Sequence, residues 1–232
     1  MSLISTADNI IPMFNKFSRF IAESGESLSP KQFSKEFIAF QRQALSSQSR
    51  DVFCSQADKL AENMLQDNNN DFAGIIYSSL CKITEFIPNE LEKFALRGYE
   101  VAKSNGDYVH MMARLNDLRK VYTRRPEKLY DYIQVLYKQE KCLKQLANHY
   151  DKSVGTYQSV IRKPASQEEY RQMLAYVQTE IGKLTKKKHP NDAMKKLLNA
   201  REIFLQSGNK QSVDYIDMLI REIQMSLKPA NK

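Results

Sequence analysis

The stretch NAREIFLQSGNKQSVDYIDMLI, residues 199–220, contains two amphipathic runs joined at Gly208. Apolar side chains recur every three or four residues on both sides of this glycine, which is the spacing of one face of an α-helix. Glycine readily takes the positive φ that often ends a helix, so Gly208 predicts a tight turn between two helices. The stretch therefore indicates a way of packing helices rather than a catalytic site.

The composition of the whole chain favours the same structure. Of its 232 residues, 42% are hydrophobic, which is enough to bury a substantial core. Only 7 Gly and 7 Pro are present, too few turn-forming residues for the many hairpins of a sandwich or a barrel. We therefore expect an all-α protein of about 9–10 helices, stacked as antiparallel pairs, with residues 1–232 forming a single domain.

Residues 1–48 predict an N-terminal pair of helices. Ser29 can cap the second helix and Pro30 suits its first position. In each helix the apolar side chains follow steps of three and four residues and so share one face. In the first helix these side chains are Ile10, Met13, Phe14, Phe17, Phe20 and Ile21, and in the second they are Phe33, Phe37, Ile38, Phe40 and Leu45.

A region similar to a helical repeat is expected over residues 49–227. One part of it departs from helical spacing: residues 151–166 contain β-branched residues and a glycine, and they predict an irregular connection with one helical turn. No domain boundary is expected there, because the flanking helices continue the pattern. The predicted helices lie at about 49–66, 71–87, 89–105, 107–123, 126–150, 166–187, 191–207 and 210–227.

Three segments share one layout, which is a helix with a small residue inside it, a short turn and a second helix. They are ADKLAENMLQDNNNDFAGIIYSSLCKI, FALRGYEVAKSNGDYVHMMARLNDLRKVY and NAREIFLQSGNKQSVDYIDMLIREI. Their turns centre near Asn70, Gly106 and Gly208, and the last two positions are 102 residues apart, which is three times 34. A period of 34 residues is typical of antiparallel helix-pair repeats.

The segments GYEVAKSNGDYVHMMARLNDL and NAREIFLQSGNKQSVDYIDML resemble the tetratricopeptide repeat family in their first helix, their tight Gly-Asp or Gly-Asn turn and their second helix. The resemblance covers about residues 57–84, 94–122 and 193–223. It implies a right-handed α-solenoid, for which an irregular helical bundle is the alternative. It also implies that small residues let neighbouring helices approach, and those at the expected contact positions are Gly98, Ala102, Ala113 and Ala200.

Motifs for catalysis or metal binding are not found in the sequence. The three histidines stand alone, outside any HExxH or Cys/His constellation, and no glycine-rich phosphate loop occurs. Cys54, Cys81 and Cys142 lack the paired spacing of a zinc site or a redox disulfide, so we interpret them as small buried side chains in a reducing compartment. We expect no catalytic residue, no metal and no cofactor, in a protein that is not an enzyme.

The sequence also predicts a cytoplasmic protein. Residues 1–20 have no basic leader, no long apolar run and no small-residue cleavage site, so they do not resemble a secretory signal. Nowhere in the chain do 18 apolar residues run together, which argues against a membrane span.

Charge is unevenly distributed along the chain. Residues 1–110 contain 11 Lys and Arg against 14 Asp and Glu, whereas residues 111–232 contain 24 against 13. Arginine binds phosphates and carboxylates, and tyrosine rings stack on bases, so the basic and tyrosine-rich residues 114–141 are a candidate binding face, as is the basic run at 183–190. A well-solvated helical surface has the same composition. The candidate partner-binding residues are Arg114, Arg119, Lys120, Arg124, Arg125, Lys128, Lys186, Lys187 and Lys188.

These features favour a non-enzymatic scaffold that binds a protein or peptide partner through a groove or a basic face, because repeat stacks present an extended surface free of core duties. One alternative is a helical protein that binds nucleic acid through its basic half. Its binding would weaken steeply as salt rises, whereas an apolar groove would not show that dependence. A second alternative is a helical enzyme whose active site carries no local motif.

Overall fold

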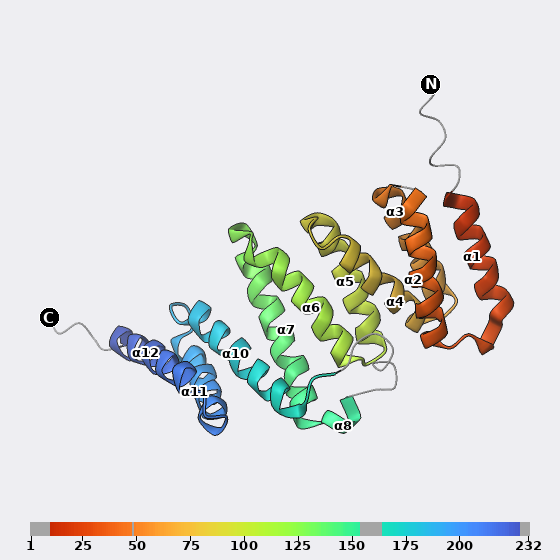
Figure 1. Ribbon diagram of the computed structural model, residues 1–232. Helices are drawn as coiled ribbons and strands as arrows, with labels where there is room; N and C mark the ends of the chain where they lie inside the picture. Colours follow the sequence, from red (N-terminus) through yellow and green to blue (C-terminus); the bar gives the residue numbers. More distant parts are fainter. Residues whose placement is uncertain (1–9, 48, 154–163, 228–232) are drawn as a thin grey trace. The chain divides into compact units, whose positions relative to one another are not determined.

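The computed structural model describes residues 10–47, 49–153 and 164–227, and these residues are almost entirely helical (Figure 1). Within these ranges there are ten α-helices of 14 residues or more, and no strand. Helices that follow one another in the sequence pack together, as α3 does on α4 and α11 on α12. The predicted all-α fold is therefore confirmed. The predicted irregular connection at 151–166 lies largely outside the described residues.

Residue contacts divide the chain into two compact units, of which the first runs to Val121 and the second begins at Tyr122. The single domain expected over residues 1–232 stays a prediction, because compact packing within each unit does not test independent folding. The helices of the first unit are α1 (Ile10–Ser24), η1 (Gly25–Ser27), α2 (Pro30–Ser47), α3 (Arg50–Gln66), α4 (Asn70–Ile83), α5 (Pro88–Ser104) and α6 (Tyr108–Thr123), whose last two residues fall in the second unit. Those of the second unit are η2 (Pro126–Lys128), α7 (Leu129–Asn148), α8 (Tyr150–Ser153), α10 (Gln167–Thr185), α11 (Pro190–Gln206) and α12 (Lys210–Leu227).

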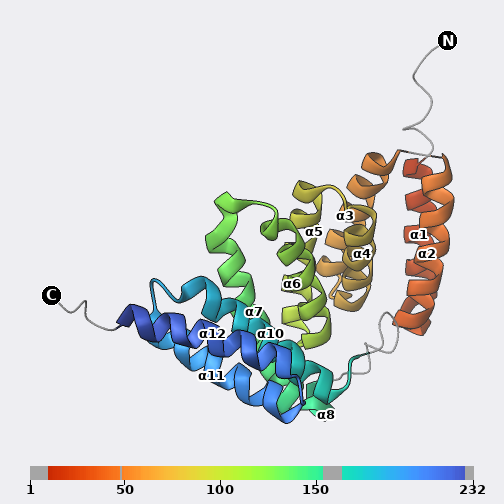
Figure 2. The same ribbon diagram turned by 60° about the vertical axis from the view of Figure 1, so that its left-hand side comes forward.

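In the first unit the helices from α1 to α5 each pack on the next one, and α1 and α2 also pack on the helix after that. The helix α4 contacts α3 and α5, and it also contacts α2, while α1 contacts α3 (Figure 2). Two hydrogen bonds join α6 to α4 and to the turn that follows it. The Arg114 guanidinium donates to the Tyr77 carbonyl of α4 at 3.3 Å, and the Lys120 ammonium donates to Glu85 in the turn after α4 at 2.6 Å. These partners are 37 and 35 residues apart, so successive helix pairs are stacked on each other.

The period of the stack differs from the expected 34 residues. The helices α1, α3 and α5 begin at residues 10, 50 and 88, which are 40 and 38 residues apart. Between the pair α5–α6 and the pair α11–α12, the described residues contain one further long pair, α7–α10, so the 102 residues from Gly106 to Gly208 span two steps rather than three. The expected period is wrong because α7 and α10 have 20 and 19 residues and a long connection between them.

Three interhelical turns each contain one residue in the left-handed backbone conformation. These residues are Asn68 with φ 59°, Gly106 with φ 66° and Gly208 with φ 71°. The first of these turns was expected to centre on Asn70, but Asn70 begins α4 and Asn68 takes the left-handed position. Asparagine tolerates this backbone conformation better than most residues because its short polar side chain bonds locally.

The two glycine turns also stop one helix and start the next in the same way. After Gly106, the Asp107 N–H donates to the Ala102 carbonyl at 2.9 Å, which closes the end of α5 in a Schellman motif. The Asp107 carboxylate then accepts the backbone N–H of His110 at 3.0 Å and caps α6. Asn209 repeats both roles between α11 and α12. The residues around Gly208 are thus a packing signature, as the sequence predicts.

We expect the substitution Gly106→Val to lower the free energy of unfolding by more than about 1 kcal/mol, because a β-branched residue is strained at positive φ. An added Cβ would meet no atom within 4 Å, so backbone strain is the whole effect. The control is Gly106→Asn, which puts at this turn the residue that Asn68 supplies at the first one. Urea unfolding should show less than half the loss for asparagine, and equal losses would contradict the strain explanation.

The buried faces of α1 and α2 follow most of the predicted stripes, but Met13 and Leu45 are half-buried and two further residues are exposed. In α1 the buried side chains are Ile10, Phe14, Phe17 and Ile21, and their steps of four, three and four define a narrow seam. Phe20 was expected in this seam but lies beside it and is 38% exposed. Ile38 of α2 is likewise 42% exposed, because Phe33, Phe37 and Phe40 form the seam.

The small residues expected at helix contacts are buried, and one of them, Gly98, lies where two helices approach closely. Gly98, Ala102, Ala113 and Ala200 are all buried. A Cβ on Gly98 of α5 would lie 2.9 Å from Cδ of Arg114 on α6, so only glycine fits there without a shift.

Candidate functional site

An apolar groove of about 510 Å³ opens on the first unit between α3, α4 and α5. Tyr77 of α4 and Val101 of α5 are buried and form its floor. Leu65 of α3 and Leu96 of α5 form its apolar sides, and Leu96 is exposed although it is apolar. The remaining lining residues are Glu62, Arg97, Glu100 and Ser104.

A buried carboxylate fixes one side of this groove. Asp58 on α3 is buried and contacts Lys93 Nζ at 2.8 Å and the guanidinium of Arg97, both on α5. Arg97 also contacts Glu62 Oε1 at 2.7 Å. Lys93 and Arg97 are one helical turn apart, so the two ion pairs set the position of α5 on α3. Arg97 is already neutralised by two carboxylates and is poorly suited to recruit a third.

The buried ring of Tyr77 on the floor of the groove is not ionised near neutral pH. Burial raises the pKa of Tyr77 to about 12, and the neighbouring Arg97 offsets only part of that rise. Glu100 on the rim pairs with Lys103 at 3.2 Å. The ring therefore stays neutral, and the charges around the rim are balanced. Such a surface favours an apolar side chain of a partner over a charged ligand.

A second hollow of about 830 Å³ lies on the first unit between α1, η1 and the α3–α4 turn. Its rim is polar and mostly exposed, and it includes the carboxamides of Asn63, Asn69 and Asn105. Asp71 on this rim accepts a hydrogen bond from Asn105 at 3.3 Å. Burial and the neighbouring Asp107 raise the pKa of Asp71. The hollow is larger than the groove, but its lining is far more polar.

The predicted basic residues of α6 differ in what they contact. Arg114 is buried, with its guanidinium 3.2 Å from Asp117 and bonded to the Tyr77 carbonyl, so it holds α6 on α4 and does not present a binding group. Lys120 is exposed and pairs with Glu85 across to the end of α4. Arg119 is half-buried. The binding role predicted for Arg119 and Lys120 stays a prediction.

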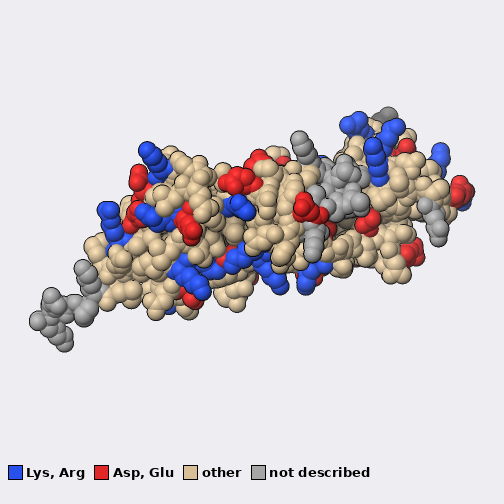
Figure 3. Space-filling view, turned by 90° about the horizontal axis from the view of Figure 1, so that it is seen from below, with Lys and Arg blue, Asp and Glu red and all other residues tan. Residues whose placement is uncertain are grey.

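The predicted basic residues of the second unit are more exposed. Arg124 is exposed and Arg125 is half-buried, while Lys128 pairs with Asp131 at 3.4 Å and lies 5.7 Å from the ring centre of Tyr122. Lys and Arg side chains are spread over the face shown in Figure 3, with Asp and Glu side chains among them.

The basic run after α10 divides in the same manner. Lys186 is half-buried and contacts Glu222 of α12, so it joins these two helices. Lys187 and Lys188 are exposed. Only the last two therefore extend into solvent as the sequence prediction requires.

A buried ion cluster in the second unit was not predicted. Glu140 of α7 is buried, and both of its carboxylate oxygens lie 2.6 Å from Lys196 Nζ of α11. Glu140 also accepts a hydrogen bond from Nε2 of Gln178 on α10 at 3.1 Å, and it forms an ion pair with Lys144 at 2.9 Å. Burial alone would raise its pKa, but these hydrogen bonds outweigh it and hold the pKa below the ordinary value of 4.5. The cluster ties three helices together.

The three cysteines and His110 are buried among the packed helices. Burial raises the pKa of Cys54 to about 12 and those of Cys81 and Cys142 to about 11, so these thiols are poor nucleophiles. His110 is buried with Nδ1 at 2.5 Å from Asp107, the residue that caps α6. Among the described residues, no group of three or more His, Cys, Asp or Glu side chains is placed to hold a metal ion.

No protein-family model matches the chain, and neither a curated protein nor a solved structure does. The structure itself defines the class: an all-α array of packed helix pairs, compatible with a helical repeat. Within the described part of the chain, no helix has the length and apolar character needed to span a membrane.

Proposed function

We propose that the protein is a non-enzymatic helical-repeat scaffold, similar to tetratricopeptide repeats in its α5–α6 and α11–α12 turns, that binds a protein or peptide partner. The observation that carries this proposal is the open apolar groove between α3, α4 and α5. Its floor is buried, the charges around it are paired within the fold, and Leu96 is exposed on its side. Apolar anchors that enter such pockets supply most of the binding energy at protein interfaces.

Site-specific photocrosslinking tests the proposal directly. A benzoylphenylalanine placed at residue 96 should crosslink one distinct protein in extract of the native host, and the additional substitution Leu65→Glu should abolish that crosslink. Residue 38 on α2 is the matched control, because Ile38 has the same 42% exposure as Leu96 but lies outside the groove. The proposal fails if residue 96 captures nothing, or if residue 38 captures the same protein.

We expect Leu96→Glu to weaken binding of that partner at least about tenfold, since a carboxylate would be desolvated against an apolar anchor. Leu96 is exposed, so the free energy of unfolding should change by only about 0.5 kcal/mol or less. Calorimetric titration of purified partner measures the first effect and urea unfolding the second. The control variant Ile38→Glu should bind as the wild type does, and a similar loss for both variants would contradict a role of the groove.

Nucleic-acid binding is the second candidate function, favoured by the exposure of Arg124, Lys187 and Lys188. If these side chains contact phosphates, replacing all three with glutamate should flatten the dependence of log K on log salt concentration. The slope should decrease in magnitude by about 0.9 for each lost contact. Fluorescence anisotropy with a single-stranded and a double-stranded oligonucleotide measures this slope. This candidate fails if the wild type shows no salt-dependent binding to either probe.

A further inference from the structure

We propose that the hollow beside the α3–α4 turn is a second binding site, and that its ligand is an extended peptide segment with a Lys or Arg side chain. The site is separate from the apolar groove and carries a binding function beyond it. Its volume of about 830 Å³ lies within the range of about 300 to 1,000 Å³ that is usual for ligand pockets. Its asparagine side chains, the asparagine rim, are those of Asn63, Asn68, Asn69, Asn70 and Asn105.

The hollow has an apolar floor below this rim. Ile21 of α1, Leu60 and Met64 of α3 and Phe72 of α4 are buried, and all four line the hollow. An apolar floor takes up part of the surface of a ligand, and a small number of polar groups then fix its orientation.

Most of the carboxamides in the asparagine rim are not used by the fold. Within the described residues, the side chains of Asn63, Asn68, Asn69 and Asn70 make no hydrogen bond to the protein. A carboxamide has one carbonyl acceptor and one NH₂ donor group, which match the N–H and C=O of a peptide bond. A helical peptide bonds these groups to itself, whereas an extended one presents them to its surroundings. The rim therefore suits an extended backbone.

The start of α4 supplies a further donor. In the corresponding turns, Asp107 caps α6 and Asn209 caps α12, and each side chain accepts the N–H three residues further on. Asn69 has the same place before α4, but its side chain makes no such bond. Among the described residues, the N–H of Phe72 consequently has no acceptor. A carbonyl group of a bound peptide can accept it, as ligands do at other helix starts.

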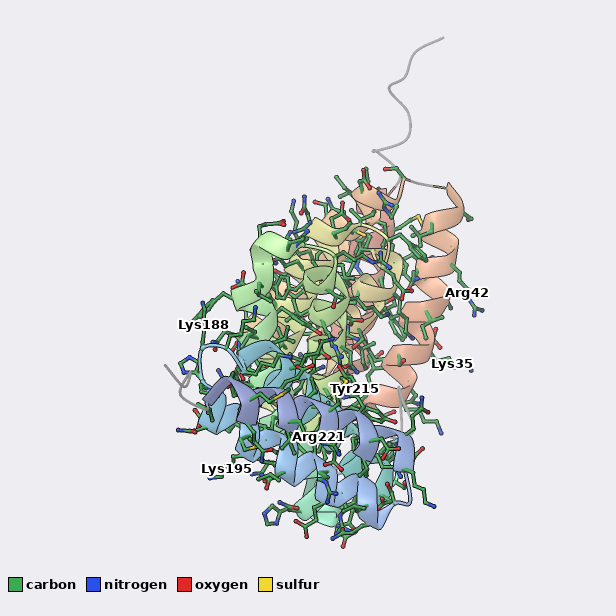
Figure 4. All side chains as sticks on the ribbon, turned by 90° about the vertical axis from the view of Figure 1, so that its left-hand side faces the viewer. Lys35, Arg42, Lys188, Lys195, Tyr215 and Arg221 are labelled. Carbon is green, nitrogen blue, oxygen red and sulfur yellow. The ribbon has the colours of Figure 1, made fainter. Side chains whose placement is uncertain are left out.

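The charges of the lining select a basic side chain. Asp67 and Asp71 line the hollow, and no Lys or Arg of the described residues does. No salt bridge neutralises Asp67 in the described part of the chain. Burial and the neighbouring Asp107 raise the pKa of Asp71, so negative charge is already concentrated there. The exposed Lys35 and Arg42 of α2 project away from the other helices of the first unit (Figure 4). A cationic side chain is thus complementary to the hollow, whereas a phosphate is not.

The test is a selection from a displayed library of random linear peptides of about seven residues, which span about 23 Å when extended. The library is first passed over the double variant Asn63→Ala/Asn69→Ala, which lacks two carboxamides of the rim. Peptides that do not bind this variant are then selected on the full-length wild-type chain. The depletion step favours neither charge. We expect Lys and Arg to be enriched over Asp and Glu at one position of the selected peptides.

A charge exchange identifies the acid that meets this side chain. The selected peptides should bind Asp67→Lys at least about tenfold more weakly than the wild type, and a peptide with Glu at the enriched position should bind the variant better than it binds the wild type. Residue 67 follows the last turn of α3, where a cation is favourable, so the variant should stay folded. Methylation of single backbone nitrogens of the peptide should weaken binding about tenfold at one or more positions, because it removes an N–H that a carboxamide accepts.

The matched control is Glu36→Lys, which reverses an exposed acid of α2 outside the hollow. It should bind the selected peptides as the wild type does, and circular dichroism should show all variants folded. The proposal is overturned if no peptide is selected, if Lys and Arg are not enriched, if the control loses as much affinity as Asp67→Lys, or if no backbone methylation weakens binding. It is also overturned if Leu96→Glu abolishes binding, because the peptides would then occupy the apolar groove.

Discussion

Replacing Glu140 with glutamine is expected to lower the free energy of unfolding by about 3 kcal/mol, because removing one partner of a buried ion pair leaves the other charge uncompensated. The substitution keeps the size of the side chain, so little of this loss comes from packing. Lys196 is the charge left behind. Its side chain is only 20% exposed, and it therefore recovers little hydration when the carboxylate is neutralised.

A double substitution separates the ion pair from other effects of the glutamine. In Glu140→Leu/Lys196→Met both charges are absent, and buried pairs replaced by apolar residues of similar size are often as stable as the original. Urea unfolding followed by circular dichroism should show the double variant less destabilised than Glu140→Gln alone. A change of less than about 0.5 kcal/mol in Glu140→Gln would show that the cluster contributes little.

The same cluster predicts a dependence on pH. The pKa of Glu140 is lower in the folded state than in the unfolded state, where it is near 4.5. Its carboxylate therefore stabilises the fold fully above the unfolded pKa, and this stabilisation is lost as pH falls through the folded pKa. The difference in unfolding free energy between wild type and Glu140→Gln should be constant from neutral pH down to about 5 and shrink below about 4. A difference that grows on acidification would contradict the assigned direction.

The helices and the turns between them are readable from the sequence because their signals are local. Apolar periodicity gives each helix to within a few residues, and Gly106 and Gly208 mark the left-handed turns that the backbone shows. Asn68 is a weaker signal, since asparagine is frequent in turns of several types and the run 68–70 contains three of them. The largest error in a helix end is at α4, which ends at Ile83 rather than near 87, before Pro88 begins α5.

The candidate sites depend on contacts between distant residues, and local patterns do not report those. Glu140 meets Gln178 and Lys196 across 38 and 56 residues, and Asp58 meets Arg97 across 39. A count of charges shows a basic half, yet it does not separate the buried Arg114 from the exposed Arg124. Leu96 did carry a signal: it lies off the seam formed by Leu91, Phe94, Ala95 and Gly98, so it is an apolar residue with no core position.

The second large effect is expected for Gly182→Val, which should lower the free energy of unfolding by about 3 kcal/mol through overpacking. Gly182 is buried in α10, and a Cβ there would lie 2.7 Å from Cγ of Leu197 and 3.2 Å from the carbonyl oxygen of Ala193, both on α11. Neither neighbour can yield easily, because Leu197 is fully buried in the core of the second unit and the carbonyl belongs to the α11 backbone. Helix propensity acts in the opposite direction, since valine is better than glycine inside a helix, so a loss of stability identifies steric contact.

Leu197→Ala provides the test of that contact. Alone, it should be destabilising by about 2 to 4 kcal/mol, because it leaves a cavity against α10. In its presence Gly182→Val has room to enter that cavity, so the added loss should fall to less than about 1 kcal/mol. Urea unfolding of the four proteins in this double-mutant cycle gives the coupling energy. Additive losses would mean that α10 and α11 move apart to admit valine. In that case the close approach at Gly182 would not be what holds α10 and α11 together.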